Sequence, residues 1–147
     1  MLVAKDSEIE SVKDLAGGGK KVAVKLGTTG HSWARAYLGG VELIVLEDPA
    51  ACVMEVVQKK AAAFIYDQIS IYRHWQRHPD TTRALLTPIR EETWGIGLRK
   101  NQPELLRQVN AWLREYREAG RFDELADRYM GEEKRDFESL GVPFIFH

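Results

Sequence analysis

The sequence predicts an α/β fold in which a parallel sheet is doubly wound, with helices on both of its faces. Three short apolar runs are each followed by a turn and then by a segment whose apolar residues recur at helical spacing. Such runs are typical of buried parallel strands, and strands that alternate with helices of this length are joined by right-handed crossovers. The expected strands are 20–27, 42–46 and 62–66, and the expected helices are 31–38, 50–58 and the segment from Ile69 to Trp75.

Short polar motifs mark where these elements begin and end. The first strand runs into Gly27, and the second helix begins with Asp48 as its N-cap, followed by a proline. Asp67 closes the third strand, and Pro79 stops the third helix. A further strand is expected over 83–88, which completes a compact alternating unit.

The last third of the chain is expected to be helical. From Pro103 onward apolar residues fall on one face at spacings of three and four, Gly120 ends the first helix, and a second helix continues to Gly131. No strands follow that these helices could cover, so we predict that the chain forms a homo-oligomer through this apolar face. The face consists of Leu105, Val109, Trp112, Leu113 and Tyr116.

Composition argues against several classes of function. The chain has 21 lysines and arginines against 22 aspartates and glutamates, a net charge of −1, which removes the electrostatic argument for a nucleic acid as partner. No apolar run approaches the roughly 20 residues of a membrane span. The single cysteine, Cys52, can form no internal disulfide, and we expect a small buried residue. His74 and His78 have a spacing that can bind a metal, but no third ligand is placed and arginines flank them, so we predict neither a metal nor a cofactor.

Polar residues follow the first and third expected strands, at the edge where open parallel sheets bind ligands. Thr28, Thr29 and Gly30 lie between the end of a strand and the start of a helix, whose N–H groups can receive a carboxylate or a phosphate. Asp67 ends the third strand on the same edge. Each signal alone is also explained by a turn or by an N-cap. Together they suit a zwitterion, with its anion at the loop and its ammonium at Asp67.

Three longer motifs follow one another along the chain: SVKDLAGGGKKVAVKLGTTG, AAAFIYDQ and WGIGLRKNQPELLRQVNAWLREYREAGRFDELADRYMG. In this order they resemble the bacterial polar amino-acid-binding proteins of ABC importers, the solute-binding protein family 3 with its type II periplasmic binding fold. The resemblance covers nearly the whole chain. In that family two α/β lobes, joined by two crossing strands, close on an amino acid.

The resemblance implies a division of the chain into parts of two lobes. Residues 1–18 would be a crossing strand and linker, 19–92 the second lobe, 93–98 the returning hinge strand, and 99–147 the C-terminal helices and tail of an incomplete first lobe. The segment that precedes the position of Met1 in this family is missing, together with the aromatic residues and the arginine that hold the ligand. We therefore expect a truncated form with an incomplete site.

The resemblance also implies roles for single residues. Thr28 and Thr29 match the loop residues that donate to the ligand carboxylate, and Asp67 matches the carboxylate that receives the α-ammonium. Tyr66 lies beside it where ligand-contacting residues vary, and Lys25 matches a residue that reaches the ligand in some members. The implied ligand-binding residues are Lys25, Thr28, Thr29, Gly30, Tyr66 and Asp67.

By this resemblance the chain is the solute-binding component of an amino-acid importer, acting in the periplasm with a membrane permease and not as an enzyme. No signal peptide is recognisable, because Met1 is followed by Lys5, Asp6 and Glu8 rather than by an apolar stretch. Two alternatives remain open: a sensory or self-assembling fragment of the same fold, and an enzyme such as a dehydratase of arogenate or prephenate. The residues do not identify the bound amino acid, because side-chain specificity in this family lies mainly in the missing segment.

Overall fold

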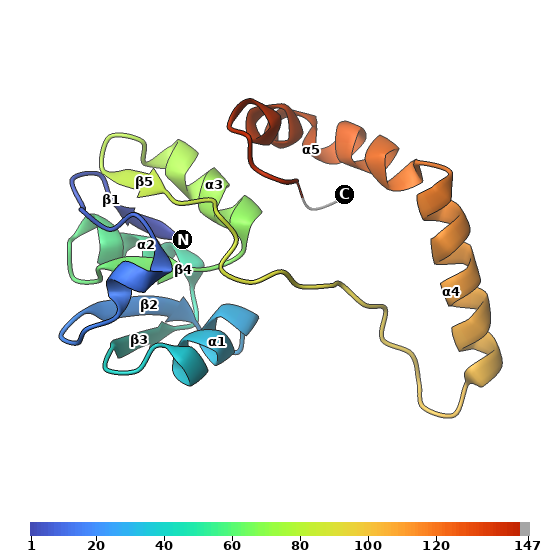
Figure 1. Ribbon diagram of the computed structural model, residues 1–147, viewed down its shortest axis with the longest axis horizontal. Coiled ribbons are helices and arrows are strands. Elements are labelled where there is room, and N and C mark those ends of the chain that lie inside the picture. Colours follow the sequence, from blue (N-terminus) through green and yellow to red (C-terminus); the bar gives the residue numbers. More distant parts are fainter. Residues whose placement is uncertain (145–147) are drawn as a thin grey trace. The chain divides into compact units, whose positions relative to one another are not determined.

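The computed structural model describes residues 1–144, and the chain divides into two compact units, Met1–Arg90 and Glu91–His147. They are called unit 1 and unit 2 below. Among the described residues all the strands belong to unit 1, whereas unit 2 contains the two long helices α4 and α5 (Figure 1). The lobe boundaries that the resemblance implies remain a prediction.

Unit 1 is built on one five-stranded sheet with the order β3-β2-β4-β1-β5. β2 pairs in parallel with β3 and β4, whereas β1 pairs antiparallel with β4 and β5. The α/β class is confirmed, with one antiparallel strand that the alternating pattern did not reveal because β1 precedes the first strand–helix repeat. The strands are β1 (Leu2–Ala4), β2 (Lys21–Lys25), β3 (Glu42–Leu46), β4 (Ala63–Ile65) and β5 (Thr82–Ala84).

Each of the strands β2, β3 and β4 is followed by a helix that begins with a polar N-cap. The caps are Thr28, Asp48 and Asp67, and each side chain accepts a hydrogen bond from a backbone N–H of the first helical turn. The helices are η1 (a 3₁₀ helix, Val12–Leu15), α1 (Thr29–Tyr37), α2 (Pro49–Val57), α3 (Gln68–Arg77), α4 (Pro103–Glu118) and α5 (Arg121–Ser139).

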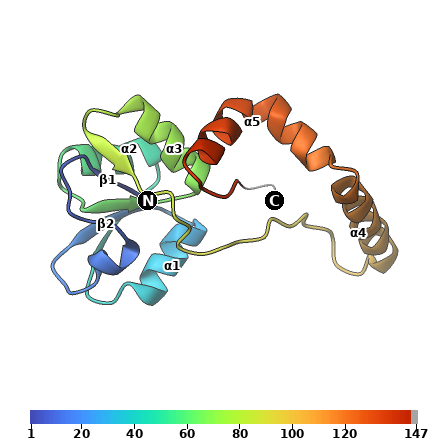
Figure 2. The ribbon, with the colours of Figure 1, turned by 45° about the horizontal axis from the view of Figure 1, so that its top comes forward.

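Helices cover both faces of the sheet, α1 on one side and α2 and α3 on the other (Figure 2). Successive side chains of a strand point to opposite faces, so each strand contributes to two buried layers. On the α1 side the cluster includes Val3, Val22, Val24, Ala34, Ala63 and Ile65. The strand residues that alternate with them are buried on the other side, against α2 and α3. This second layer includes Leu2, Ala23 and Phe64 of the strands and Cys52, Val53, Val56 and Ile71 of the two helices.

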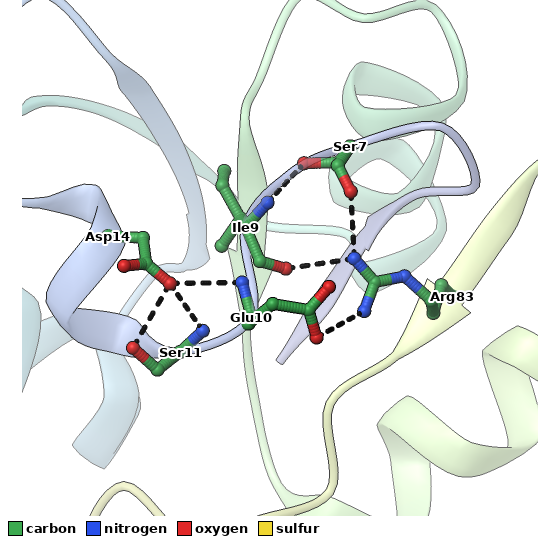
Figure 3. A network of polar contacts seen from close by, with 6 residues as sticks. All are labelled: Ser7, Ile9, Glu10, Ser11, Asp14 and Arg83. Atoms are coloured by element: carbon green, nitrogen blue, oxygen red, sulfur yellow. Dashed lines mark hydrogen bonds and ion pairs between the residues drawn. The ribbon is translucent and has the colours of Figure 1, made fainter.

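One arginine fixes the chain between β1 and η1 onto β5 (Figure 3). The guanidinium of Arg83 donates to the carbonyl oxygens of Ser7 and Ile9 at 2.8 and 3.0 Å and to the carboxylate of Glu10 at 3.0 Å. Beside it, the backbone N–H of Glu10 donates to the Asp14 carboxylate, and this bond holds the pKa of Asp14 below its ordinary value. The loop is therefore held by hydrogen bonds to charged groups, which are stronger than neutral ones.

In unit 2 the expected return strand over 93–98 forms no strand pairing, and this expectation is wrong. Its two glycines leave the backbone loosely restrained, and the described part of unit 2 has no neighbouring strand to pair with. Helix α4 follows as expected but buries none of its residues. Leu106 and Trp112 are 50% and 53% exposed. Within residues 1–144 no helix combines the length and apolar character needed to span a bilayer.

The second helix of unit 2 does not end at Gly131, where we expected its C-terminus. It continues, although the backbone leaves helical geometry at Met130, with φ −144° and ψ 31°. Beyond this point the ammonium of Lys134 lies 2.7 Å from the carboxylates of both Asp123 and Asp127. The glycine therefore marks a kink, and ion pairs across it hold the second helical segment against the first.

For a chain produced with Met1 as its first residue, we expect the stability of unit 1 to rise with pH between about 5 and 8. The amino group of Met1 is buried and donates a hydrogen bond of 2.7 Å to the Leu85 carbonyl, and burial lowers its pKa from 8.0 to about 5. In this window the unfolded chain binds a proton that the folded chain does not, so each unit of falling pH costs about 1.4 kcal/mol. Urea unfolding at several pH values measures the change. A chain with residues added before Met1 is the control, and an equal pH dependence there would contradict the assignment.

Candidate functional site

Parallel pairing brings three helix N-termini to one edge of the sheet. β2, β3 and β4 run in the same direction, so their carboxyl ends lie at the same edge, and each end leads into a helix. Neighbouring strands are about 4.8 Å apart, so the loops that follow β2 and β4 are neighbours too. The register pairs Val24 with Ile65, which places the residues after them at the same level of the sheet.

The loop after β2 presents the N-terminus of α1. The hydroxyl of Thr28 accepts from the His31 N–H at 3.2 Å and donates to the Lys25 carbonyl at 2.8 Å. The N–H groups of Thr29 and Gly30 have no acceptor among the described residues. The side chain of Thr29 is exposed. This N-terminus therefore offers two backbone donors and one hydroxyl, at the positive end of a helix dipole.

Gly30 allows this loop to approach β4 closely. A Cβ atom at Gly30 would lie 3.2 Å from the carbonyl oxygen of Ile65 and 3.3 Å from its Cγ2. Ile65 ends β4, two residues before Asp67. The structure therefore brings the Thr28–Gly30 loop to the strand end that carries Asp67, as the sequence pattern suggested.

Asp67 is both the N-cap of α3 and an exposed carboxylate. Its Oδ1 accepts from the Ser70 N–H at 2.9 Å. An ionised carboxylate has further acceptor positions, so a cation can still bind. Asp48 caps α2 in the same way, accepting from the Ala50 N–H at 2.9 Å. Only α1 has a neutral cap among these three helices, so an anion is favoured there and a cation is favoured at Asp67.

Lys25 and Tyr66 follow the paired residues Val24 and Ile65 and emerge on the opposite face of the sheet, toward α2 and α3. The ring of Tyr66 stacks on Phe64, with centroids 5.4 Å apart and planes at 18°. Partial burial raises the pKa of Tyr66, and the Asp67 carboxylate adds to the shift. Lys25 is half-buried, and its side-chain ammonium forms no hydrogen bond or ion pair with the described residues. Both residues lie beside the Thr28–Gly30 loop, but neither is among the hydrogen-bond donors at the N-terminus of α1.

Two further titratable side chains, Cys52 of α2 and His74 of α3, lie on the α2–α3 side of the sheet. Cys52 is buried as expected, and burial raises the pKa of its thiol to about 11. The imidazole of His74 packs against the ring of Phe64, with ring centroids 6.3 Å apart, and burial lowers the pKa of this imidazole. The described part of the chain contains no group of three or more His, Cys, Asp or Glu that could hold a metal ion. Gln68 was not among the residues that the sequence pattern indicated for the site, because the only feature that points to it is its position directly after Asp67.

Comparison with protein-family profiles finds no match. The chain is 27% identical over 133 residues to the ABC transporter glutamine-binding protein of Bacillus subtilis, which covers 90% of this chain and 48% of the relative. An ancestral amino-acid-binding protein described as a precursor of cyclohexadienyl dehydratase is 32% identical, with a TM-score of 0.69, over 87% of this chain and 54% of that one. A binding component of an ABC transporter from Wolinella succinogenes, solved with lysine, is 27% identical with a TM-score of 0.75, over 86% and 56%. The chain spans about half the length of the curated relatives it matches.

We expect Gly30→Ala to destabilise unit 1 by about 1 kcal/mol, even though alanine is the better helix former. The added methyl would meet the Ile65 carbonyl at 3.2 Å, so α1 must move away from the end of β4. Gly39→Ala is the matched control, because a Cβ atom there meets nothing within 4 Å. Urea unfolding compares the two variants. Equal stability of both would mean that α1 does not depend on this close approach.

Proposed function

We propose, on the premise that the homologues of this chain are amino-acid-binding proteins of ABC transporters, that unit 1 carries half of a binding site for a polar amino acid. The observation that carries this proposal is the close approach of Gly30 to Ile65, which sets the α1 N-terminus beside the strand end bearing Asp67. A helix N-terminus favours a carboxylate and Asp67 favours an ammonium. A free amino acid carries both groups on one carbon atom.

The α-carboxylate would be held by the N–H groups of Thr29 and Gly30 and by the hydroxyl of Thr29. The hydroxyl proton of Thr28 is committed to the Lys25 carbonyl, so this residue serves the site by capping α1 rather than by donating directly. The α-ammonium would donate to the oxygen atoms of Asp67. Lys25 and Tyr66 would contact the part of the ligand that extends over the α2–α3 side of this edge.

The activity of the whole protein is proposed by extension. The chain would form part of the solute-binding component of an amino-acid importer, working in the periplasm with a membrane permease, with lobe two over 19–92 and part of lobe one over 99–147. The role would be binding and not catalysis, because the solved relative linked to a dehydratase is itself described as an amino-acid-binding protein.

We expect the isolated chain to bind glutamine with a dissociation constant of about 1 mM or weaker. Micromolar binding needs about 8 kcal/mol, and a few charge-assisted contacts of about 1.5 to 3 kcal/mol each cannot supply this after the entropy of association is subtracted. Asp67→Asn keeps the N-cap but removes the charge, and should weaken binding about tenfold. Asp48→Asn makes the same change on α2 and should leave binding intact. NMR titration of the backbone amides measures both, and equal effects of the two variants would refute the proposed ammonium site.

We also expect the chain to form homo-oligomers through α4. Each large apolar side chain that becomes fully buried contributes about 1.5 to 3 kcal/mol, and Leu105 and Trp112 of the apolar face are 41% and 53% exposed. Trp112→Gln should therefore shift the chain toward the monomer in analytical ultracentrifugation at micromolar concentration. Tyr37→Gln on α1 is the control, since Tyr37 is a large exposed side chain of unit 1. A wild-type chain that sediments as a monomer would refute the self-assembling alternative as well.

A further inference from the structure

We infer that Gln68 is a positioning residue that anchors the segment leaving unit 1 to the edge of the sheet that carries the candidate site. Gln68 is the first residue of α3, directly after Asp67, and its side chain is half-buried. Its Nε2 donates a hydrogen bond of 2.6 Å to the carbonyl oxygen of Leu86. Leu86 lies two residues beyond the end of β5 and is itself buried.

The chain leaves β5 at the same edge of the sheet. β1 is antiparallel to both β4 and β5, so the start of β1 and the ends of β4 and β5 lie together. There the Leu85 N–H donates to the Met1 carbonyl at 2.8 Å, and the Met1 amino group donates to the Leu85 carbonyl at 2.7 Å. The exit of the chain from unit 1 is thus a neighbour of the strand end that leads into Asp67.

The contact of Gln68 with Leu86 is the last hydrogen bond of unit 1 along the chain. Residues 87–90 take part in none among the described residues, although Ile89 packs against the buried cluster on the α1 side. The side-chain carboxamide of Gln68 therefore forms the hydrogen bond at which the hydrogen-bonded part of unit 1 ends along the chain. Because Gln68 is fixed to the first turn of α3, a movement of that turn is passed directly to the Leu86 carbonyl.

This geometry gives the proposed site a mechanical link, and this part of the inference rests on the proposed function. An ammonium bound to Asp67 would attract its carboxylate, and this carboxylate also caps α3 by accepting a hydrogen bond from the Ser70 N–H. Gln68 lies between the cap and Ser70 in the sequence, and so it takes part in any adjustment of that turn. Ligand binding at Asp67 would then shift the Leu86 carbonyl, although Leu86 contributes no group to the site.

The anchoring is tested first without ligand, by hydrogen–deuterium exchange of the Leu85 amide relative to the Ala62 amide. Ala62 donates to the Lys21 carbonyl at 2.7 Å within the same sheet and reports global opening. Gln68→Met removes the donor at similar size, and should raise the Leu85 rate about fivefold relative to Ala62, the factor that corresponds to a hydrogen bond of about 1 kcal/mol. Gln68→Glu, isosteric and without a donor when ionised, should do the same and serves if the methionine variant does not fold.

Gln76→Met is the matched control. Gln76 lies on the same helix and its Nε2 also donates one hydrogen bond, of 2.7 Å, to the hydroxyl of Tyr72. This variant should leave the ratio of the Leu85 and Ala62 rates unchanged. An unchanged ratio in both Gln68 variants, or an equal rise in Gln76→Met, would overturn the anchoring.

The mechanical link is tested by adding glutamine to the labelled chain and following the amides of Thr29, Ser70 and Thr87. Wild-type protein should show shifts at all three amides with one apparent dissociation constant, and Gln68→Met should lose more than half of the shift at Thr87 only. Shifts at Thr29 and Ser70 without any at Thr87 would overturn the link while leaving the proposed function in place. Absence of all shifts would refute amino-acid binding and the link together, whereas the anchoring is decided by the exchange ratio.

Discussion

The parallel pairing of β2 between β3 and β4 is the constraint on which the rest of unit 1 depends. It fixes the register of Val24 against Ile65 on one side and against Val45 on the other. Since a shift by one residue would turn every buried side chain of a strand to the other face, the two buried layers hold this register in place. The same register then decides which loops are neighbours at the carboxyl edge. The candidate site is therefore a consequence of core packing, because no long-range contact between its polar residues is needed to assemble it.

The electrostatics of this edge come from a difference between three otherwise similar helix starts. Aspartates cap α2 and α3, so a negative charge already sits at each of these N-termini. Thr28 caps α1 with a neutral hydroxyl and leaves the positive end of that helix uncompensated. A helix N-terminus stabilises an anion by only about 0.3 to 1 kcal/mol at an exposed position. The neighbouring backbone donors and Asp67 are therefore required as well, and a ligand with both charges is the species that uses them together.

The two units differ in how far their own residues bury their apolar surface. Unit 1 places its apolar residues in two layers around the sheet, with Leu2, Val3, Val22 and Phe64 fully buried. Helix α4 also has an apolar face but fully buries none of its residues, although Val109, Leu113 and Tyr116 are half-buried and the rings of Tyr116 and Phe122 are in contact, with centroids 5.0 Å apart. In unit 1 a few short helices cover both faces of the sheet, so both sides of a strand are buried. In a pair of helices each helix has only one neighbour, so the rest of its surface stays exposed. The chain also spans only about half the length of its curated relatives, and within residues 1–144 α4 has no buried residue, whereas the sheet has many.

The sequence alone determined the alternation of strands and helices, the capped start of α2 and the separate helical character of the last third, because these follow from local periodicity and short polar motifs. For Asp67 it left an N-cap of α3 and a ligand-binding carboxylate both open. It also indicated Thr29 and Asp67, since strand ends of a parallel sheet meet at one edge. It could not determine that β1 lies antiparallel between β4 and β5, because this pairing depends on strands distant in sequence. Nor could it determine that Gly131 lies at a kink and not at a helix end, because a glycine is compatible with both and the ion pairs of Lys134 appear only in the folded helix. Only the tertiary structure showed that the Thr28 hydroxyl is used by the cap and that Gln68 reaches Leu86. Such assignments require distances between side chains and carbonyls, which the fold sets and the residue pattern does not.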